Sequence, residues 1–255
     1  IFKVPNSEPV SYAAADEYLS GNVRTKLIIA QAAAKDDPEL AVNVEALKQV
    51  IPKDLSAAEI SVRLGTTWIP QEDIQQFVME LLTPSQYARG KIKVRYTEFN
   101  GDWFIENKSS DFDNVKANST YGTKRASAYR IIEDTLNLRD VRIFDYVYDE
   151  QGNKKAVFNA KETTAAQAKQ EAIKQAFQDW IWKDPERRNR LVRYYNDTFN
   201  CIRPREYDGS HITFGGISPE ITLRPHQVNA IAHILYGGNT LLAHKVGAGK
   251  SATRS

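Results

Sequence analysis

The sequence has little sulfur and no long apolar run. Its 255 residues include one cysteine, Cys201, and one methionine, Met79. A lone cysteine cannot form an internal disulfide and supplies too few thiolates for a structural zinc site, which favours a reducing compartment. No stretch reaches the roughly 20 apolar residues that cross a bilayer, and the N-terminal residues lack the zones of a secretory signal. We therefore expect a cytoplasmic protein that does not enter a membrane.

Neither sign of charge is in excess. The 34 Lys and Arg residues face 32 Asp and Glu residues, which leaves a formal net charge of +2, and 42% of the residues are hydrophobic. This composition is typical of a folded globular chain and excludes a disordered tail, which would combine high net charge with few apolar residues. Because the chain starts at Ile1 and has no methionine before Met79, we expect it to be a piece of a larger protein.

Residues 1–84 are predicted to be a helical region. Capping residues and helical spacing predict three helices, over 11–19, 23–34 and 38–50. Ser11 is the expected cap of the first, and Asp37-Pro38 starts the third. A capping box is expected at 56–59. The clearest amphipathic helix follows Pro70, with one apolar stripe made of Ile74, Phe77, Val78, Leu81 and Leu82.

Residues 85–200 are predicted to be an α+β linker or DNA-engaging domain. Alternating residues over 92–105 predict a hairpin, in which Asn100-Gly101 supplies two residues of positive φ for a tight turn. The other expected elements are a loop over 108–121, a helix over 128–136, strands over 141–148 and 154–158, a helix from 164 and a helix over 185–199. The helix from 164 is expected to pack through the side that carries Ala165, Ala168, Ala172, Ala176 and Trp180.

Residues 201–220 lack periodicity and are predicted to be a connector. After it, a helix is expected to bury Val228, Ile231, Ile234 and Leu235, and a short strand over 240–243 leads into a glycine-rich segment. This order of strand, glycine loop, lysine and serine is typical of a P-loop. The fold class expected for the whole chain is α+β, mostly helical with two short β-hairpins, followed by the truncated start of an α/β, RecA-like helicase lobe over 221–255.

The P-loop residues have defined chemical roles. Gly247, Ala248 and Gly249 allow backbone N–H groups to converge on phosphates, Lys250 approaches the β and γ oxygens, and Ser251 offers its hydroxyl to Mg²⁺. His244 stands where the pattern has its first glycine. Upstream, the carboxamide of Gln227 can donate to one atom of an adenine edge and accept from the exocyclic amine, with Arg224 beside it. ATP and Mg²⁺ are therefore the expected cofactors.

Several segments resemble a known family. The box at 223–227 and the loop at 244–251 resemble the LRPYQ box and DEMGLGKT loop of superfamily two helicases of the chromatin-remodeller type. Longer segments are similar to very large phage and conjugative-element proteins that join an adenine-specific DNA methylase to a helicase-type ATPase, at 18–24, 62–70, 199–205 and 235–244. The resemblance implies a linker between methylase and translocase, an ATP site, and DNA as the partner.

The sequence also departs from that family. It contains no acidic helicase box, no second lobe and no Asn-Pro-Pro-Tyr methylase box, so S-adenosylmethionine would belong to a methylase portion outside it. Phosphoryl transfer needs a metal-holding acid and an oriented water besides the loop. No catalytic residue is therefore assigned in this chain. The alternative is a non-catalytic structural or protein-interaction spacer with an idle glycine loop.

Two groups of basic residues are candidate DNA contacts. Arg187, Arg188, Arg190 and Arg193 follow Pro185 and are interleaved with aromatic residues, a pattern that suits a nucleic-acid strand. The second group is Lys91, Lys93, Arg95, Lys124 and Arg125. Nearby acids leave the alternative of a solvated charged face open for the first group, and the same alternative is open for the second because sheet faces normally carry such charges. The four histidines lack the spacing of a metal site, and Cys201 is expected to be a buried apolar residue.

Overall fold

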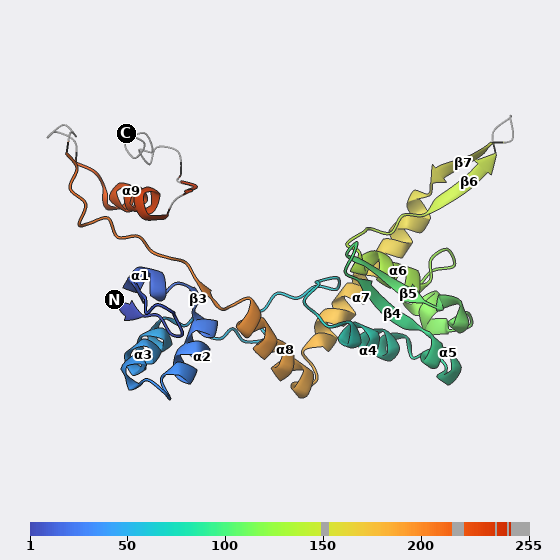
Figure 1. Ribbon diagram of the computed structural model, residues 1–255. Coiled ribbons are helices and arrows are strands. Elements are labelled where there is room, and N and C mark those ends of the chain that lie inside the picture. Colours follow the sequence, from blue (N-terminus) through green and yellow to red (C-terminus); the bar gives the residue numbers. More distant parts are fainter. Residues whose placement is uncertain (149–152, 216–221, 238, 244, 246–255) are drawn as a thin grey trace. The chain divides into compact units, whose positions relative to one another are not determined.

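The computed structural model describes residues 1–148, 153–215, 222–237, 239–243 and 245 (Figure 1). The chain forms two compact units, which we call unit 1 (residues 1–54 and 195–255) and unit 2 (residues 55–194). These divisions differ from the predicted boundaries at 84 and 200. The reason is that the helix after Pro70 packs on the hairpin that follows it, so both belong to one core. The described fold is α+β, and each of its sheets has two antiparallel strands.

Unit 1 is built from short helices and two small sheets. Its elements are β1 (Phe2–Lys3), β2 (Tyr12–Ala13), α1 (Ala15–Tyr18), β3 (Gly21–Asn22), α2 (Val23–Ala33), the 3₁₀ turn η1 (Pro38–Leu40), α3 (Ala41–Val50), β8 (Ile202–Arg203) and α9 (Pro225–Gly237). The core of the unit joins α2 to α3 through Val23, Ala30, Val44 and Leu47. Both helices lie where they were predicted.

The predicted helix over 11–19 is wrong in its first half. Tyr12 and Ala13 form β2, which pairs with β1 in the register Phe2↔Ala13, and only residues 15–18 are helical. Ser11 caps no helix, because its backbone carbonyl accepts a hydrogen bond from the N–H of Val4 at 2.9 Å. The predicted connector also starts later than expected, since β8 pairs with β3. Pairing with a distant segment decided both cases.

Unit 2 contains the longer helices and two hairpins. Its elements are α4 (Gln71–Leu82), α5 (Gln86–Lys91), β4 (Lys93–Thr97), β5 (Asp102–Glu106), the short turns η2 (Lys108–Asp111) and η3 (Lys116–Thr120), α6 (Ala128–Leu136), β6 (Phe144–Tyr148), β7 (Lys154–Phe158), α7 (Ala160–Ile181) and α8 (Pro185–Thr198). The division between the units falls inside α8. Sequence reasoning missed α5, η2 and η3.

The core of unit 2 forms where α4, the β4–β5 hairpin, α6 and α7 meet. The apolar stripe predicted for α4 is confirmed, with Ile74, Phe77, Val78 and Leu82 buried and Leu81 half-buried. Phe77 meets Phe177 of α7 edge to face, with ring centroids 5.1 Å apart. Such aromatic pairs contribute about 0.5–1.5 kcal/mol beyond the burial of their area. This contact fixes α7 against α4.

Two turns differ from the prediction. The first hairpin closes through a four-residue loop between Thr97 and Asp102, and only Gly101 has positive φ, at +71°. The N–H of Gly101 donates to the carbonyl of Thr97 at 2.8 Å, which closes the loop without a positive φ at Asn100. The capping box forms in part, because Glu59 accepts from the N–H of Ser56 at 2.8 Å. No helix follows it, since residues 60–64 alternate between buried and exposed positions.

The predicted packing side of α7 is wrong. Ala165, Ala168 and Ala172 are exposed, and Ala176 and Trp180 are half-buried. The buried stripe consists of Thr163, Ala166, Gln170, Ile173, Phe177 and Ile181, and the helix begins at Ala160 rather than 164. Burying an isoleucine or phenylalanine side chain contributes about 1.5–3 kcal/mol, far more than a methyl group does. The burial of Ile173, Phe177 and Ile181 therefore decides which side of α7 faces the core, in preference to the side that carries the alanines.

The C-terminal helix is confirmed, but its predicted face is only partly buried. Helix α9 buries Gln227, Ala230 and Ala232, whereas Val228 and Ile231 are half-buried and Ile234 and Leu235 are exposed. The strand expected over 240–243 is not formed, because no described strand pairs with these residues. Within the part of the chain that the structure describes, no helix has the length and apolar character required to span a bilayer.

Candidate functional site

The predicted adenine-reading residues lie at the start of α9. Pro225 occupies the first turn, and the side-chain oxygen of Gln227 accepts a hydrogen bond from the backbone N–H of Arg224 at 2.8 Å. This bond satisfies one of the amide groups that a helix leaves open at its N-terminus. It also holds the buried carboxamide of Gln227 in place, and a carboxamide oxygen keeps a second lone pair for another donor. Arg224 itself is exposed.

The phosphate-binding part of the candidate site lies outside the described residues. This applies to Gly247, Ala248, Gly249, Lys250, Ser251 and His244. The described geometry of this site therefore ends with Arg224, Gln227 and the segment up to Ala243. Their assignment to ATP and Mg²⁺ stays a prediction.

Arg187, the first of the four clustered arginines, is used inside the fold. Its side chain is buried on α8, and its guanidinium donates to the carbonyls of Ile181 at 3.0 Å and Trp180 at 2.7 Å. The same group lies 3.5 Å from the centroid of the Trp180 ring. Burial lowers the pKa of Arg187, although Asp184 opposes this shift. Arg187 thus closes the C-terminal end of α7 and is not presented to a phosphate.

The other three arginines divide between the fold and the surface. Arg190 forms an ion pair of 2.6 Å with Asp73, a buried residue of α4. One oxygen of that carboxylate is buried without a hydrogen-bond partner. Arg188 and Arg193 have exposed side chains. The structure therefore does not bring the four predicted DNA-binding residues onto one exposed surface, because Arg187 is buried. Arg190, whose side chain is exposed despite its ion pair, stays a candidate for such contact together with Arg188 and Arg193.

Two of the five residues of the second basic group are paired with carboxylates, and a third lies over an aromatic ring. The ammonium of Lys91 lies 3.9 Å from the centroid of the Tyr87 ring, Arg95 pairs with Glu106 at 3.5 Å, and Arg125 pairs with Asp145 at 2.7 Å. Lys93 and Lys124 are exposed. Exposed pairs of this kind contribute at most about 1 kcal/mol and are typical of a solvated charged face. The geometry favours that alternative for this group.

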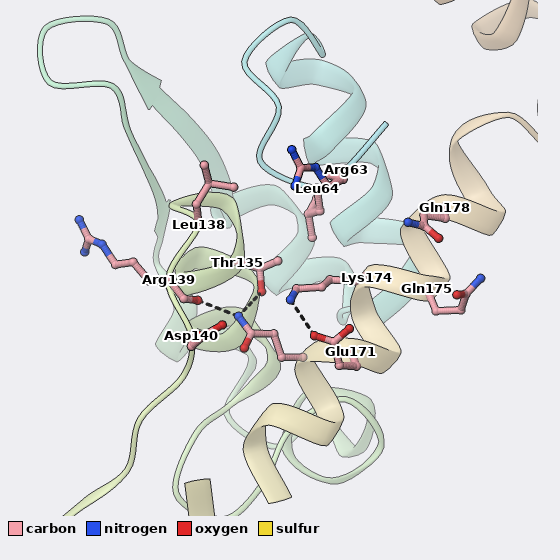
Figure 2. Close-up of a pocket in the computed structure, with 11 residues that line it drawn as sticks. Arg63, Leu64, Thr135, Leu138, Arg139, Asp140, Glu171, Lys174, Gln175 and Gln178 are labelled. Carbon is pink, nitrogen blue, oxygen red and sulfur yellow. Dashed lines mark hydrogen bonds and ion pairs between the residues drawn. The ribbon is translucent and has the colours of Figure 1, made fainter. Parts of the chain in front are cut away.

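A pocket of about 520 Å³ lies in unit 2 between the end of α6, the middle of α7 and the segment at Arg63 (Figure 2). Gln170 forms its inner wall, with its amide group donating to Thr135 at 3.1 Å and to the carbonyl of Arg139 at 2.8 Å. Figure 2 shows Lys174 reaching from α7 toward Thr135, and its ammonium pairs with Glu171 at 2.7 Å. The volume is that of a small-ligand site.

The pocket depends on close backbone approach. Gly65 has φ of +101°, and a Cβ added there would lie 2.7 Å from the carbonyl oxygen of Leu136. Leu138 has φ of +56°, which is uncommon for a residue with a side chain. The lining combines the cations of Arg63 and Lys174 with the carboxylate of Asp140, which suits a polar ligand. Sequence reasoning missed this pocket, and Gly65 was the one local signal for it.

Cys201 and the described histidines have other surroundings than a metal site. Cys201 is buried, as predicted, and its thiol donates to the carbonyl of Thr198 at 3.1 Å. His226 is exposed, and the ring of His233 stacks on Tyr207 with centroids 4.3 Å apart. No cluster of three or more potential metal-ligating side chains occurs among the described residues.

Comparison with known proteins gives one match. The family described as Domain of unknown function (DUF8437) matches residues 63–201, which is more than half of the chain. The matched segment contains α4 to α8 and the whole pocket of unit 2. No curated protein and no solved structure matches the chain. The chain therefore belongs to the family described as Domain of unknown function (DUF8437).

Proposed function

We propose that this chain is part of a DNA-modifying protein that joins adenine methylation to an ATP-dependent DNA translocase. In this proposal unit 2 is the inter-domain region, and the segment from residue 221 onward is the start of the ATPase lobe. The observation that carries the proposal is the placement of Gln227 in the first turn of α9, ahead of a glycine loop that ends in Lys-Ser.

Each residue of the proposed nucleotide site has one task. Gln227 reads the adenine edge, and Arg224 lies beside it at the helix start. Gly247, Ala248 and Gly249 surround the phosphates, and Lys250 neutralises them. Ser251 holds Mg²⁺, which reduces the charge of the phosphate oxygens.

The proposal is tested by nucleotide binding. A fluorescent ATP analogue is titrated with Mg²⁺ against this chain and against the parent protein extended through the complete first lobe. Lys250→Ala is expected to weaken binding to the extended form about tenfold or more, because a charge-assisted contact to phosphate is lost. Lys245→Ala is the matched control and should bind as the parent does. Absence of binding by the extended form at millimolar ATP refutes the proposal.

Base selectivity gives a second readout. Gln227→Ala should reduce the preference for ATP over GTP about tenfold, since a bidentate contact to a base edge is worth about 1–3 kcal/mol. Gln86→Ala, at an exposed glutamine of α5, is the control for removal of a carboxamide. An unchanged ratio of ATP to GTP affinity would remove Gln227 from the site while leaving the P-loop assignment open to the Lys250 test.

A second candidate function is a structural or protein-interaction spacer. It is favoured by one observation, the use of Arg187 and Arg190 as internal contacts of unit 2. The two functions differ in the nucleotide experiment, because a spacer binds ATP in neither form. Retained stability of unit 2 in a Lys250→Ala variant is expected under both.

A further inference from the structure

Unit 1 is assembled from two stretches of chain that the whole of unit 2 separates. Residues 1–54 form the first stretch and residues 195–255 form the second. The stretches pair through β3 and β8, with Gly21 opposite Arg203. Figure 1 shows the segment that follows α8 passing beside β3. Because a two-stranded sheet is only marginally stable by itself in water, other contacts must support this pairing.

A row of further contacts joins residues 16–24 to residues 200–205, and we call these two segments the seam. The backbone N–H of Val23 donates to the carbonyl of Cys201 at 3.0 Å, and both residues are buried. The other contacts across the seam are a hydrogen bond of 3.3 Å from Arg203 to the carbonyl of Leu19 and an ion pair of 2.8 Å between Arg205 and Asp16. The seam thus continues the β3–β8 pairing in both directions along the chain.

Arg24 lies where the seam meets the two ends of the insertion. Its guanidinium donates to the carbonyls of Asn200 at 3.0 Å and Pro52 at 2.9 Å, and it also pairs with Asp54. Arg24 and Asn200 are 176 residues apart in the chain, and the side chain of Arg24 is only 12% exposed. Asn200 in turn donates from its side chain to the carbonyl of Lys53 at 2.8 Å. One guanidinium thus binds the chain on both sides of the insertion.

The apolar core does not replace the seam as the link between the stretches. The core cluster described for unit 1 takes all its members from the first stretch, including Tyr18, Ala30 and Leu47. The second stretch is therefore attached to the first through the seam rather than through this core.

The family match draws nearly the same division of the chain. It covers residues 63–201, and unit 2 comprises residues 55–194. A domain whose ends lie close together can be inserted into another without disrupting either fold. The hydrogen bond between Asn200 and Lys53 shows that the chain leaves unit 1 and returns to it at neighbouring points. Unit 2 therefore has the features of an inserted module.

We propose that unit 2 is a side branch of this chain, and that the seam, together with Arg24, joins the two stretches of unit 1 directly. A conformational change or a pulling force then passes from one stretch to the other across the seam, without deforming unit 2. In an in-line spacer, by contrast, unit 2 is the only link between the stretches. Combined with the proposed function, on which this last step rests, the seam couples residues 16–24 to the segment ahead of the ATPase lobe.

The test cuts the full chain at one end of the insertion. A recognition site for a specific protease is placed between Asp54 and Leu55, and the cleaved protein is diluted and analysed by size-exclusion chromatography. The parent is expected to keep the fragment 1–54 bound at micromolar concentration, because the seam is intact. Arg24→Ala should raise the dissociation constant of the fragment about tenfold or more, since the hydrogen bond of a charged group to Asn200 is lost.

A second variant acts from the other side of the cut. Asn200→Ala removes the carboxamide that binds the carbonyl of Lys53, and it should raise the dissociation constant about threefold or more. Lys35→Ala is the matched control, because Lys35 is an exposed cation of the same fragment, and it should bind as the parent does. Tryptophan emission is recorded for each variant, since all four tryptophans lie in unit 2 and report whether that unit stays folded.

Two results overturn the proposal. The first is separation of the cleaved parent at micromolar concentration, which would show that the seam does not hold the stretches together. The second is retention of the fragment by Arg24→Ala and Asn200→Ala as tightly as by Lys35→Ala, which would show that contacts outside the seam hold it.

The outcome is separable from the nucleotide site. Lys250→Ala should retain the fragment 1–54 as the parent does, because the seam contains no residue of the P-loop. Absence of ATP binding with a retained fragment therefore refutes the proposed function alone. Release of the fragment with retained ATP binding refutes the side-branch proposal alone.

Discussion

Removal of the Arg187 side chain should destabilise unit 2 strongly. Arg187 differs in this from its neighbours at positions 186, 188, 189 and 190 of α8, which are also charged or polar but are exposed. The guanidinium closes the C-terminus of α7 by donating to two carbonyls, at 2.7 and 3.0 Å, and lies 3.5 Å from the centroid of the Trp180 ring. The carbonyls at a helix C-terminus have no partner within the helix. Arg187→Ala removes this donor from both carbonyls, although the Trp180 carbonyl still accepts from the backbone N–H of Lys183 at 3.1 Å.

The magnitude follows from the contacts that are lost. Hydrogen bonds to a charged group contribute about 1.5–3 kcal/mol each, and a partly desolvated cation over an aromatic ring about 0.5–2 kcal/mol. Because the Trp180 carbonyl keeps a second donor, we count one such hydrogen bond and the ring contact in full, and we expect Arg187→Ala to lower the free energy of unfolding by about 3 kcal/mol. For a unit of this size that corresponds to roughly 10 °C in the unfolding midpoint. Arg187→Lys should recover about 1 kcal/mol at most, because an ammonium cannot bind both carbonyls in the same fork geometry.

Tryptophan fluorescence is the assay, because all four tryptophans lie in unit 2. Thermal and urea unfolding of the full chain are followed at this signal. Arg188→Ala is the matched control, since Arg188 is the next residue of α8 and its side chain is exposed. If Arg187→Ala shifts the midpoint no more than Arg188→Ala does, the closing role of Arg187 is refuted. If it folds as the parent does and loses affinity for DNA, the original assignment to DNA is correct.

Three further predictions concern unit 2. Gly65→Ala should cost more than about 2 kcal/mol, because φ is +101° and the new methyl group would clash with the α6 backbone, whereas Gly90→Ala, with open space around it, should be neutral or stabilising in a urea melt. Burial raises the pKa of the Asp134 carboxyl, so its ionised form is penalised at neutral pH and the penalty disappears below the unfolded pKa. Asp134→Asn should therefore stabilise the protein at pH 7 and do so less as the pH falls through that range, and a gain independent of pH would contradict this. Arg190→Ala should cost about 1–3 kcal/mol because the buried Asp73 loses its partner, and adding Asp73→Asn should restore part of that loss in a double-mutant cycle.

The helix α7 illustrates how far sequence reasoning extends. Its existence was predicted from periodicity, and the side it buries was not, because alanines and large apolar residues offer two stripes on one helix. Helix α9 shows the same limit. Its start at Pro225 was predicted, but Ile234 and Leu235 were expected to be buried and are exposed. Start signals act within one turn of a helix, whereas the buried face depends on what other elements bring to it.

The candidate sites divide in the same way. The order of chemical groups from Gln227 to Ser251 could be written down from the sequence, because a phosphate loop is a local pattern. The pocket beside Gly65 could not, because its walls come from segments far apart in the chain. The sequence likewise gave no sign that Arg187 would be buried while Arg188 stayed exposed, since both lie in the same basic run.

By itself, the sequence determined the helices with strong local starts, such as those after Asp37 and Asp184, and the pairing of both unit 2 hairpins. Only the tertiary structure decided that Gly21 pairs with Arg203, that Arg187 closes α7, and that Tyr146 and Tyr148 are exposed in the described part of the chain. The physical reason is the distance along the chain over which each interaction acts. Caps and turns are stabilised by atoms within a few residues, whereas burial and long-range pairing depend on partners that no local pattern names.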